Sequence, residues 1–104
     1  MKLLLTTTIL TLAMTGSAMA DAAAGKTVYA AKCQKCHGAN GEGKAAIAAM
    51  LKVTMKPLTS PEVKALSDAA MTKDITQGVG KMVPVKPITD AEVKDVIAYV
   101  RSLK

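Results

Sequence analysis

Cys33-Gln34-Lys35-Cys36-His37 is the stretch of sequence that decides the fold of this 104-residue chain. Two thiols at this spacing can each add across one vinyl group of a haem, and the imidazole that follows directly can bind the iron. The five residues therefore predict covalent attachment of a haem, with its proximal ligand included in the same motif.

Other kinds of site also use a C-x-x-C pair. A thioredoxin-like dithiol follows a strand within a βαβ pattern, and the sequence around this pair shows neither. A zinc site takes four ligands, usually Cys and His, but the chain contains only two Cys and one His. A carboxylate could complete such a set, and a structural disulfide is a further alternative. Haem attachment fits the motif better than any of these.

The first twenty residues have the features of a cleaved export signal. Lys2 supplies a positive charge, residues 3–14 are largely apolar, and Ala18-Met19-Ala20 has the small-x-small pattern that signal peptidase cuts. The apolar run is too short to cross a hydrocarbon core, which needs about 20 residues. An uncleaved anchor is the alternative. We expect 1–20 to be a cleaved Sec-type signal peptide and 21–104 to form a single domain that is exported from the cytoplasm.

The composition of 21–104 favours a core that includes a cofactor. The segment contains no Phe or Trp, and its only aromatic residues are Tyr29 and Tyr99. A domain of this length buries a modest core, and domains of this size often depend on a cofactor or a covalent link. A buried porphyrin would supply apolar mass, so we expect the chain without haem to fold poorly.

Helical patterns dominate the chain, and no segment alternates as a strand would. The sequence predicts helices over about 22–32, over 45–51, from Pro61 onward, and over 68–77. Ser67 is expected to cap the last of these at its N-terminus.

The C-terminal helix has the clearest signals. Thr89 and Glu92 form a capping box, with Pro87 just before it. One face of this helix is apolar and consists of Val93, Val96, Ile97, Val100 and Leu103. Tyr99 lies beside this face, and Gly25 in the first predicted helix would allow close backbone approach. We expect the first and last helices to cross there.

A second axial ligand for the iron must come from elsewhere in the chain. A Met thioether is a suitable ligand that raises the reduction potential, and four Met residues follow the predicted cleavage site. Met71 is expected to face inward from helix 68–77, and Met50 is also interpreted as core filler. Met55 and Met82 each begin an M-x-P sequence in a predicted loop. The glycines and prolines around Met82 favour it, but chain reach leaves Met55 open.

Together these features resemble the class I c-type cytochromes, which are small soluble monohaem proteins of bacteria. The resemblance rests on Gly25 and Tyr29, on the motif from Cys33 to His37, on the glycine-rich segment 38–43, on Met82 with Pro84, and on the ending from Tyr99 to Leu103. It covers both ends of 21–104 and leaves 45–67 largely unmatched. It implies an all-α small cytochrome c fold, with crossing N- and C-terminal helices and shorter helices and loops around one haem.

The resemblance also implies the ligands and the function. Haem c would be bound to Cys33 and Cys36, with His37 as the proximal iron ligand and Met82, in the last loop before the C-terminal helix, as the distal one. The protein would be a one-electron carrier and not an enzyme, soluble and monomeric. Val83 separates Met82 from its proline, unlike in many members of the family. With no Phe or Trp near the haem, the pocket would be lined by Ile75, Val79, Val83 and Val85.

The positive charge of the chain suggests how it could bind its redox partners. The chain has a formal net charge of +6, and loss of Lys2 leaves +5. Lys32 and Lys35 lie beside the haem motif, while Lys81 and Lys86 flank the predicted distal ligand. They could steer acidic docking surfaces on membrane respiratory complexes, reductases or other cytochromes. A plain solvated lysine surface is the alternative, and nucleic acid is not expected because stacking aromatics are lacking.

Two points about the iron site stay open at this level. If Met82 does not bind the iron, the protein would be a haem-based sensor or small-ligand binder with an open or labile distal site. The other ring N–H of His37 is expected to donate to a backbone carbonyl, with 52–57 as the candidate segment.

Overall fold

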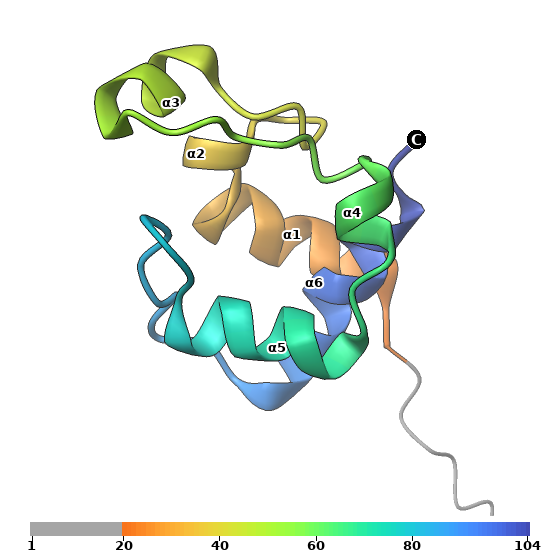
Figure 1. Ribbon diagram of the computed structural model, residues 1–104. Helices are drawn as coiled ribbons and strands as arrows, with labels where there is room; N and C mark the ends of the chain where they lie inside the picture. Colours follow the sequence, from red (N-terminus) through yellow and green to blue (C-terminus); the bar gives the residue numbers. More distant parts are fainter. Residues whose placement is uncertain (1–19) are drawn as a thin grey trace, which may run out of the picture.

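The computed structural model describes residues 20–104, in which all regular elements are helices (Figure 1). They are α1 (Ala22–Lys32), α2 (Gln34–His37), α3 (Ala45–Leu51), α4 (Pro61–Lys64), α5 (Asp68–Gln77) and α6 (Asp90–Ser102). The predicted all-α class is confirmed. The predicted signal peptide, apart from Ala20, lies outside the described residues. Within residues 20–104, none of the helices has the length and apolar character needed to span a bilayer.

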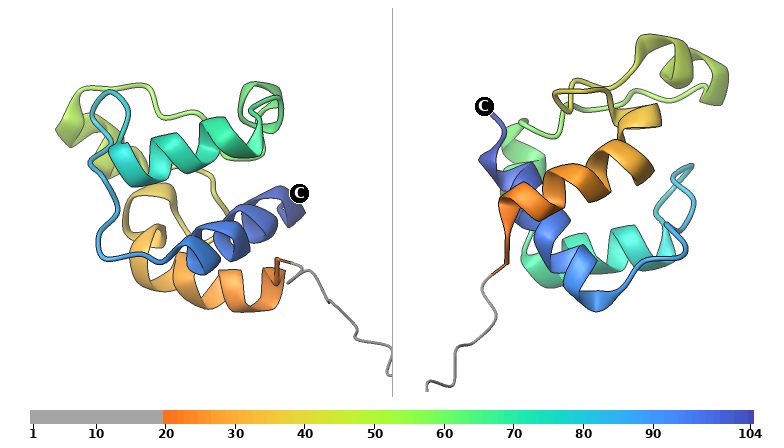
Figure 2. Two further views of the ribbon diagram at one scale, coloured as in Figure 1. Left: turned by 90° about the horizontal axis from the view of Figure 1, so that it is seen from below. Right: turned by 180° about the vertical axis from the view of Figure 1, so that it is seen from behind.

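Helices α1 and α6 cross at the centre of the molecule, as the views in Figures 1 and 2 agree. Tyr29 is 1% exposed there, and its ring centroid lies 5.1 Å from that of Tyr99 with the planes tilted by 57°, a favourable arrangement for two aromatic rings. Gly25 is buried at the crossing. A Cβ on it would collide with the main-chain carbonyl of Asp95 and lie 3.0 Å from Tyr99 Cβ. The predicted pairing of Gly25 with the Tyr99 region is therefore confirmed.

Helix α6 begins with the predicted capping box. The Thr89 hydroxyl accepts a hydrogen bond from the Glu92 N–H at 3.1 Å, and the Glu92 carboxylate accepts one from the Thr89 N–H at 3.0 Å. The bonds from Thr89 lower the pKa of the Glu92 carboxyl group. Such caps stabilise a helix by about 1 kcal/mol. The buried face of α6 consists of Val93, Val96, Ile97 and Val100.

Helix α5 completes the core beneath the crossing. The Ser67 hydroxyl accepts from the Ala70 N–H at 3.1 Å, and the helix ends at Gly78, whose φ of 81° favours glycine. Met71 and Ile75 are buried and pack into the same cluster as the inner face of α6, as predicted. This packing fixes the start of the loop that follows α5.

Arg101 ties the end of α6 to the start of α5. Its guanidinium group pairs with the Asp68 carboxylate at 2.7 Å and donates to the Leu66 carbonyl at 2.7 Å. Because both side chains of the ion pair are partly exposed, it is worth no more than about 1 kcal/mol. The carbonyl contact fixes the path of the chain into α5.

Helix α3 lies away from the α1–α6 crossing, at the upper left of Figure 1. It buries none of its residues, and Met50 is 69% exposed. The interpretation of Met50 as core filler is therefore wrong. Four of the seven residues of α3 are alanines, which offer little apolar surface to a core.

Candidate functional site

The haem motif lies at the junction of α1 and α2. The Cys33 N–H donates to the Tyr29 carbonyl at 2.9 Å, which continues α1, and the Cys33 carbonyl accepts from the N–H groups of Cys36 and His37 at 3.2 and 3.0 Å. One helical turn therefore holds both thiols and the imidazole. Cys33 is half-buried and Cys36 is exposed. Burial raises the pKa of the Cys33 thiol.

The alternatives for this motif find no support in the structure. Both cysteines are free thiols, so the structure shows no disulfide between them. Within residues 20–104, no three His, Cys, Asp or Glu side chains come together as metal ligands, so a zinc site lacks its donor set. The motif also follows a helix, and a thioredoxin-like dithiol would follow a strand.

The loop after the motif is pinned to it by main-chain hydrogen bonds. The Gly43 N–H donates to the His37 carbonyl at 2.7 Å, and the Lys44 N–H donates to the Cys36 carbonyl at 3.0 Å. The Tyr29 hydroxyl donates to the Gly38 carbonyl at 2.5 Å. Burial raises the pKa of Tyr29 to about 12, so its hydroxyl stays protonated as a donor at neutral pH. The core of α1 and the haem motif are thus joined directly.

The His37 imidazole has the properties of a metal ligand. Burial lowers its pKa, which favours the neutral ring that can bind a metal ion. Its Nδ1 atom is buried and makes no hydrogen bond to any described residue. The expected carbonyl acceptor in 52–57 is therefore not found. A neutral imidazole and two free thiols on one helical turn are the donor set that a covalently attached haem requires.

Met82 lies in the loop between α5 and α6, and hydrogen bonds hold this loop in place. The Val79 N–H donates to the Met82 carbonyl at 3.0 Å, and the Met82 N–H donates to the Val79 carbonyl at 2.9 Å. After this tight turn, the Val85 N–H donates to the Ile75 carbonyl at 2.8 Å and returns the chain to α5. In Figures 1 and 2 the loop lies at the same end of the molecule as α2.

Met55 lies in a different part of the site. A Cβ atom built on Gly43 would be 3.2 Å from Met55 Cγ and 3.3 Å from Met55 Sδ. Since Gly43 is hydrogen-bonded to the His37 carbonyl, Met55 packs against the loop that directly follows the proximal residue. The two M-x-P methionines thus lie in different parts of the fold: Met55 packs against the loop that follows His37, and Met82 lies in the loop that leads into α6.

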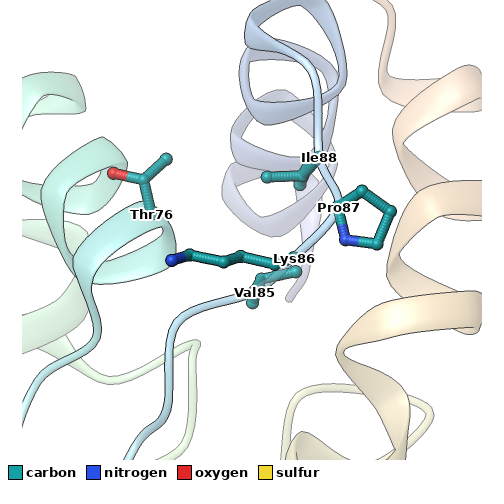
Figure 3. A pocket seen from close by; sticks show the side chains of 5 residues that line it. All are labelled: Thr76, Val85, Lys86, Pro87 and Ile88. Atoms are coloured by element: carbon teal, nitrogen blue, oxygen red, sulfur yellow. The ribbon is translucent and has the colours of Figure 1, made fainter.

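The aliphatic residues expected to line the haem pocket differ in how far they are exposed to solvent. Ile75 is buried and Val85 is half-buried, whereas Val79 and Val83 are 53% and 74% exposed. A shallow depression of about 610 Å³ lies beside them, lined by Thr76, Val85, Lys86, Pro87 and Ile88. Figure 3 shows Lys86 reaching across it toward α5. None of the three haem-motif residues lines this depression, so it is not by itself the haem site.

Two leucines in the segment between α3 and α5 were missed by the sequence analysis. Leu58 and Leu66 pack against the core, and the Leu58 N–H donates to the Gly41 carbonyl at 2.8 Å. The resemblance to the family left this segment largely unmatched, so it drew no attention to these residues. The apolar character of the two leucines among polar neighbours is the signal that could have identified them. Leu58 thus fastens the middle of the chain to the loop after the haem motif.

Three comparisons relate this geometry to known proteins. The family model for cytochrome c matches residues 22–104. Subunit CcoP of the cbb3-type cytochrome c oxidase of Azospirillum brasilense is 36% identical over 89 residues, which is 80% of this chain but 30% of that subunit. The solved structure of the KustC0563 c-type cytochrome matches with a TM-score of 0.63 and 28% identity, covering 77% of this chain and 96% of that one.

The family match covers the features from which the site was built. It includes the crossing helices α1 and α6, the motif from Cys33 to His37 and the loop that carries Met82. The matched structure has the same fold over nearly its whole length, and the chain spans about a third of the oxidase subunit that it matches. The chain belongs to the cytochrome c family, as a small c-type cytochrome that binds haem c covalently and transfers electrons.

Proposed function

We propose that this protein is a soluble periplasmic one-electron carrier in which Cys33 and Cys36 hold the haem and His37 and Met82 bind its iron. The placement of the two candidate methionines carries this proposal. Met82 lies in a hydrogen-bonded loop at the same end of the molecule as α2, whereas Met55 packs against Gly43 in the loop that follows His37. Haem bound at these residues supplies one-electron redox chemistry. Two protein ligands leave no position for a substrate, so we propose no enzymatic role.

The residues around the haem would tune this chemistry. The Met82 thioether would favour the ferrous state and thereby raise the reduction potential. His37 is kept neutral by burial, and the turn that holds it is hydrogen-bonded to α1. The loop carrying Met82 is tied to Ile75 by the Val85 N–H. Anchored ligands move little between oxidation states, which suits rapid electron transfer.

The alternative is a sensor or ligand binder with a labile distal site, and carbon monoxide separates the two. We expect the spectrum of the reduced protein to stay unchanged after carbon monoxide is added, because Met82 blocks the distal position. A Met82→Ala variant serves as the positive control and should respond promptly. A prompt shift in the unmodified protein would contradict the carrier proposal and favour a sensor.

The proposed periplasmic location depends on export and on cleavage after Ala20. The family match begins at residue 22, and α1 begins at the same residue. Both therefore start after the proposed cleavage site. Signal-peptide features and covalent haem attachment agree with an oxidising compartment outside the cytoplasm.

For its partners, we propose redox proteins with acidic docking surfaces. Lys35, Lys81 and Lys86 are exposed, and none of them forms an ion pair within residues 20–104. Exposed and unpaired cations on the loop before α6 suit a transient partner of opposite charge. The oxidase subunit among the relatives is consistent with a membrane respiratory complex as one such partner.

Reversing charge on this loop should slow association. We expect a Lys81→Glu, Lys86→Glu variant to react at least about tenfold more slowly with a small acidic electron-transfer protein at low ionic strength, with the difference shrinking as salt is added. Stopped-flow absorbance of the haem measures the rate. The matched control is Lys26→Glu, Lys104→Glu, which changes the net charge equally at two exposed positions outside this loop. Equal slowing in both variants would contradict a localised docking surface.

A further inference from the structure

The residue that follows the predicted cleavage site is in contact with the last helix. The main-chain N–H of Asp21 donates to the Asp95 carboxylate on α6 at 2.8 Å. Ala20 and Asp21 are both exposed, and Asp21 is extended, with φ −105° and ψ 107°. The nitrogen atom of the bond that would be cut is therefore the atom that contacts α6.

We infer that cleavage between Ala20 and Asp21 creates an ion pair between the new α-ammonium group and the Asp95 carboxylate, which fastens the start of α1 to α6. This inference rests on the processing proposed above. Hydrolysis by signal peptidase adds one water across the peptide bond: Ala20 leaves with a carboxylate, and Asp21 keeps an amine. An α-amino group has a pKa of about 7.7–8.0 and is largely protonated at neutral pH. A neutral donor thus becomes a charged donor at the same place.

The electrostatic surroundings favour this charge. A positive group at a helix N-terminus is normally disfavoured by the helix dipole. Here the Asp21 carboxylate offsets that effect, since it accepts hydrogen bonds from the N–H groups of Ala23 and Ala24 at 2.8 and 3.2 Å. Asp95 forms no ion pair with any other described residue. The ammonium group would lie near two carboxylates, and charge-assisted hydrogen bonds are about twice as strong as neutral ones.

The position of Asp95 gives the pair its structural effect. Its main-chain carbonyl is the group against which Gly25 packs where α1 and α6 cross. The side chain of the same residue holds the chain one turn earlier, at Asp21. The mature N-terminus therefore reinforces the helix crossing on which the core is built. A chain that carried extra residues before Asp21 would have only the neutral hydrogen bond.

Four exported, haem-loaded proteins test the inference. They are the mature chain, its Asp95→Asn variant, and the same two chains with two serines inserted between Ala20 and Asp21, so that cleavage leaves the ammonium group two residues away. Intact mass establishes each N-terminus. In urea unfolding at neutral pH and low salt, we expect Asp95→Asn to raise the unfolding equilibrium constant of the mature chain about 1.5- to 5-fold more than that of the extended chain.

The controls separate an ion pair from a general effect of the substitution. Asp74→Asn on α5 removes the same charge away from the N-terminus and should act equally in both backgrounds. Added salt should reduce the difference seen with Asp95→Asn. Equal losses from Asp95→Asn in both backgrounds would overturn the inference, and so would an exported chain that does not begin at Asp21. The proposed electron-carrier function is judged separately, from the haem spectra of the same proteins.

Discussion

A Cys33→Ser, Cys36→Ser variant is expected to lose its covalent haem and most of its helix content. Among the described residues, only seven apolar side chains are buried, each with less than about a tenth of its surface exposed. Tyr29 is the single aromatic residue among them. A core of this size offsets little of the conformational entropy lost on folding, so the porphyrin is needed as part of it. Haem staining of a denaturing gel and far-ultraviolet circular dichroism measure the two losses.

Single substitutions provide the matched controls for this prediction. Cys33→Ser and Cys36→Ser alone each keep one thioether bond, and we expect them to retain more haem and more helix than the double variant. Cys36 is exposed, so changing it disturbs the protein packing least. A double variant with the helix content of the unmodified protein would contradict the claim that haem is part of the core.

A Met82→Ala variant is expected to have a lower reduction potential, by on the order of 0.1 V. Axial ligands set haem potentials over a range of about 0.8 V, and a thioether favours the ferrous state. Loss of the side chain should leave the loop in place, because the loop is held by main-chain bonds between Val79 and Met82 and between Val85 and Ile75. A redox titration measures the potential, and the covalent haem content should not change.

Met55→Ala is the control for the Met82 substitution, since it removes the same thioether from the other M-x-P sequence. Its side chain packs against Gly43 in the loop that follows His37, so we expect a potential close to that of the unmodified protein. A fall in potential for Met55→Ala, without one for Met82→Ala, would show that the two methionines have been assigned the wrong way round.

Much of the fold could be predicted from the sequence because its signals are local. Ser67 and Gly78 bound α5 through a side-chain cap and a positive φ, and the capping box of Thr89 and Glu92 starts α6. Each signal depends on residues within a few positions of one another, so it can be found without knowing the tertiary structure. The crossing at Gly25 was predictable for another reason, since a glycine inside a helix indicates close backbone approach.

The contacts that were missed join residues far apart in the chain. The hydrogen bond between Asp21 and Asp95 spans 74 positions, and the pair formed by Arg101 and Asp68 spans 33. No periodicity or cap indicates such pairs. Met50 was misjudged for a related reason: an apolar residue in a short helix is buried only if another element covers it, and no element within residues 20–104 covers Met50.

The predicted haem site also combines residues that local sequence identifies with a residue that it does not. Cys33, Cys36 and His37 could be predicted as haem-binding residues from five adjacent positions, and family membership supports haem c at the cysteines. The distal ligand could not be chosen from the sequence, because Met55 and Met82 lie in similar local sequences. The structure places Met55 against Gly43, in the segment after His37, and Met82 in the loop before α6, and this difference supports the proposed choice of Met82. The contact between Met55 and Gly43 depends on the tertiary path of the chain after α3, which local sequence signals do not give.

The most direct test of His37 and Met82 ligation is the absorption band of the oxidised protein at the red end of the visible spectrum, which reports the bond from methionine sulfur to iron. The unmodified protein, Met55→Ala and Met82→Ala would be compared at equal haem concentration. We predict that the band is present in the unmodified protein and in Met55→Ala and is absent from Met82→Ala. A band that survives in Met82→Ala and disappears in Met55→Ala would contradict the account.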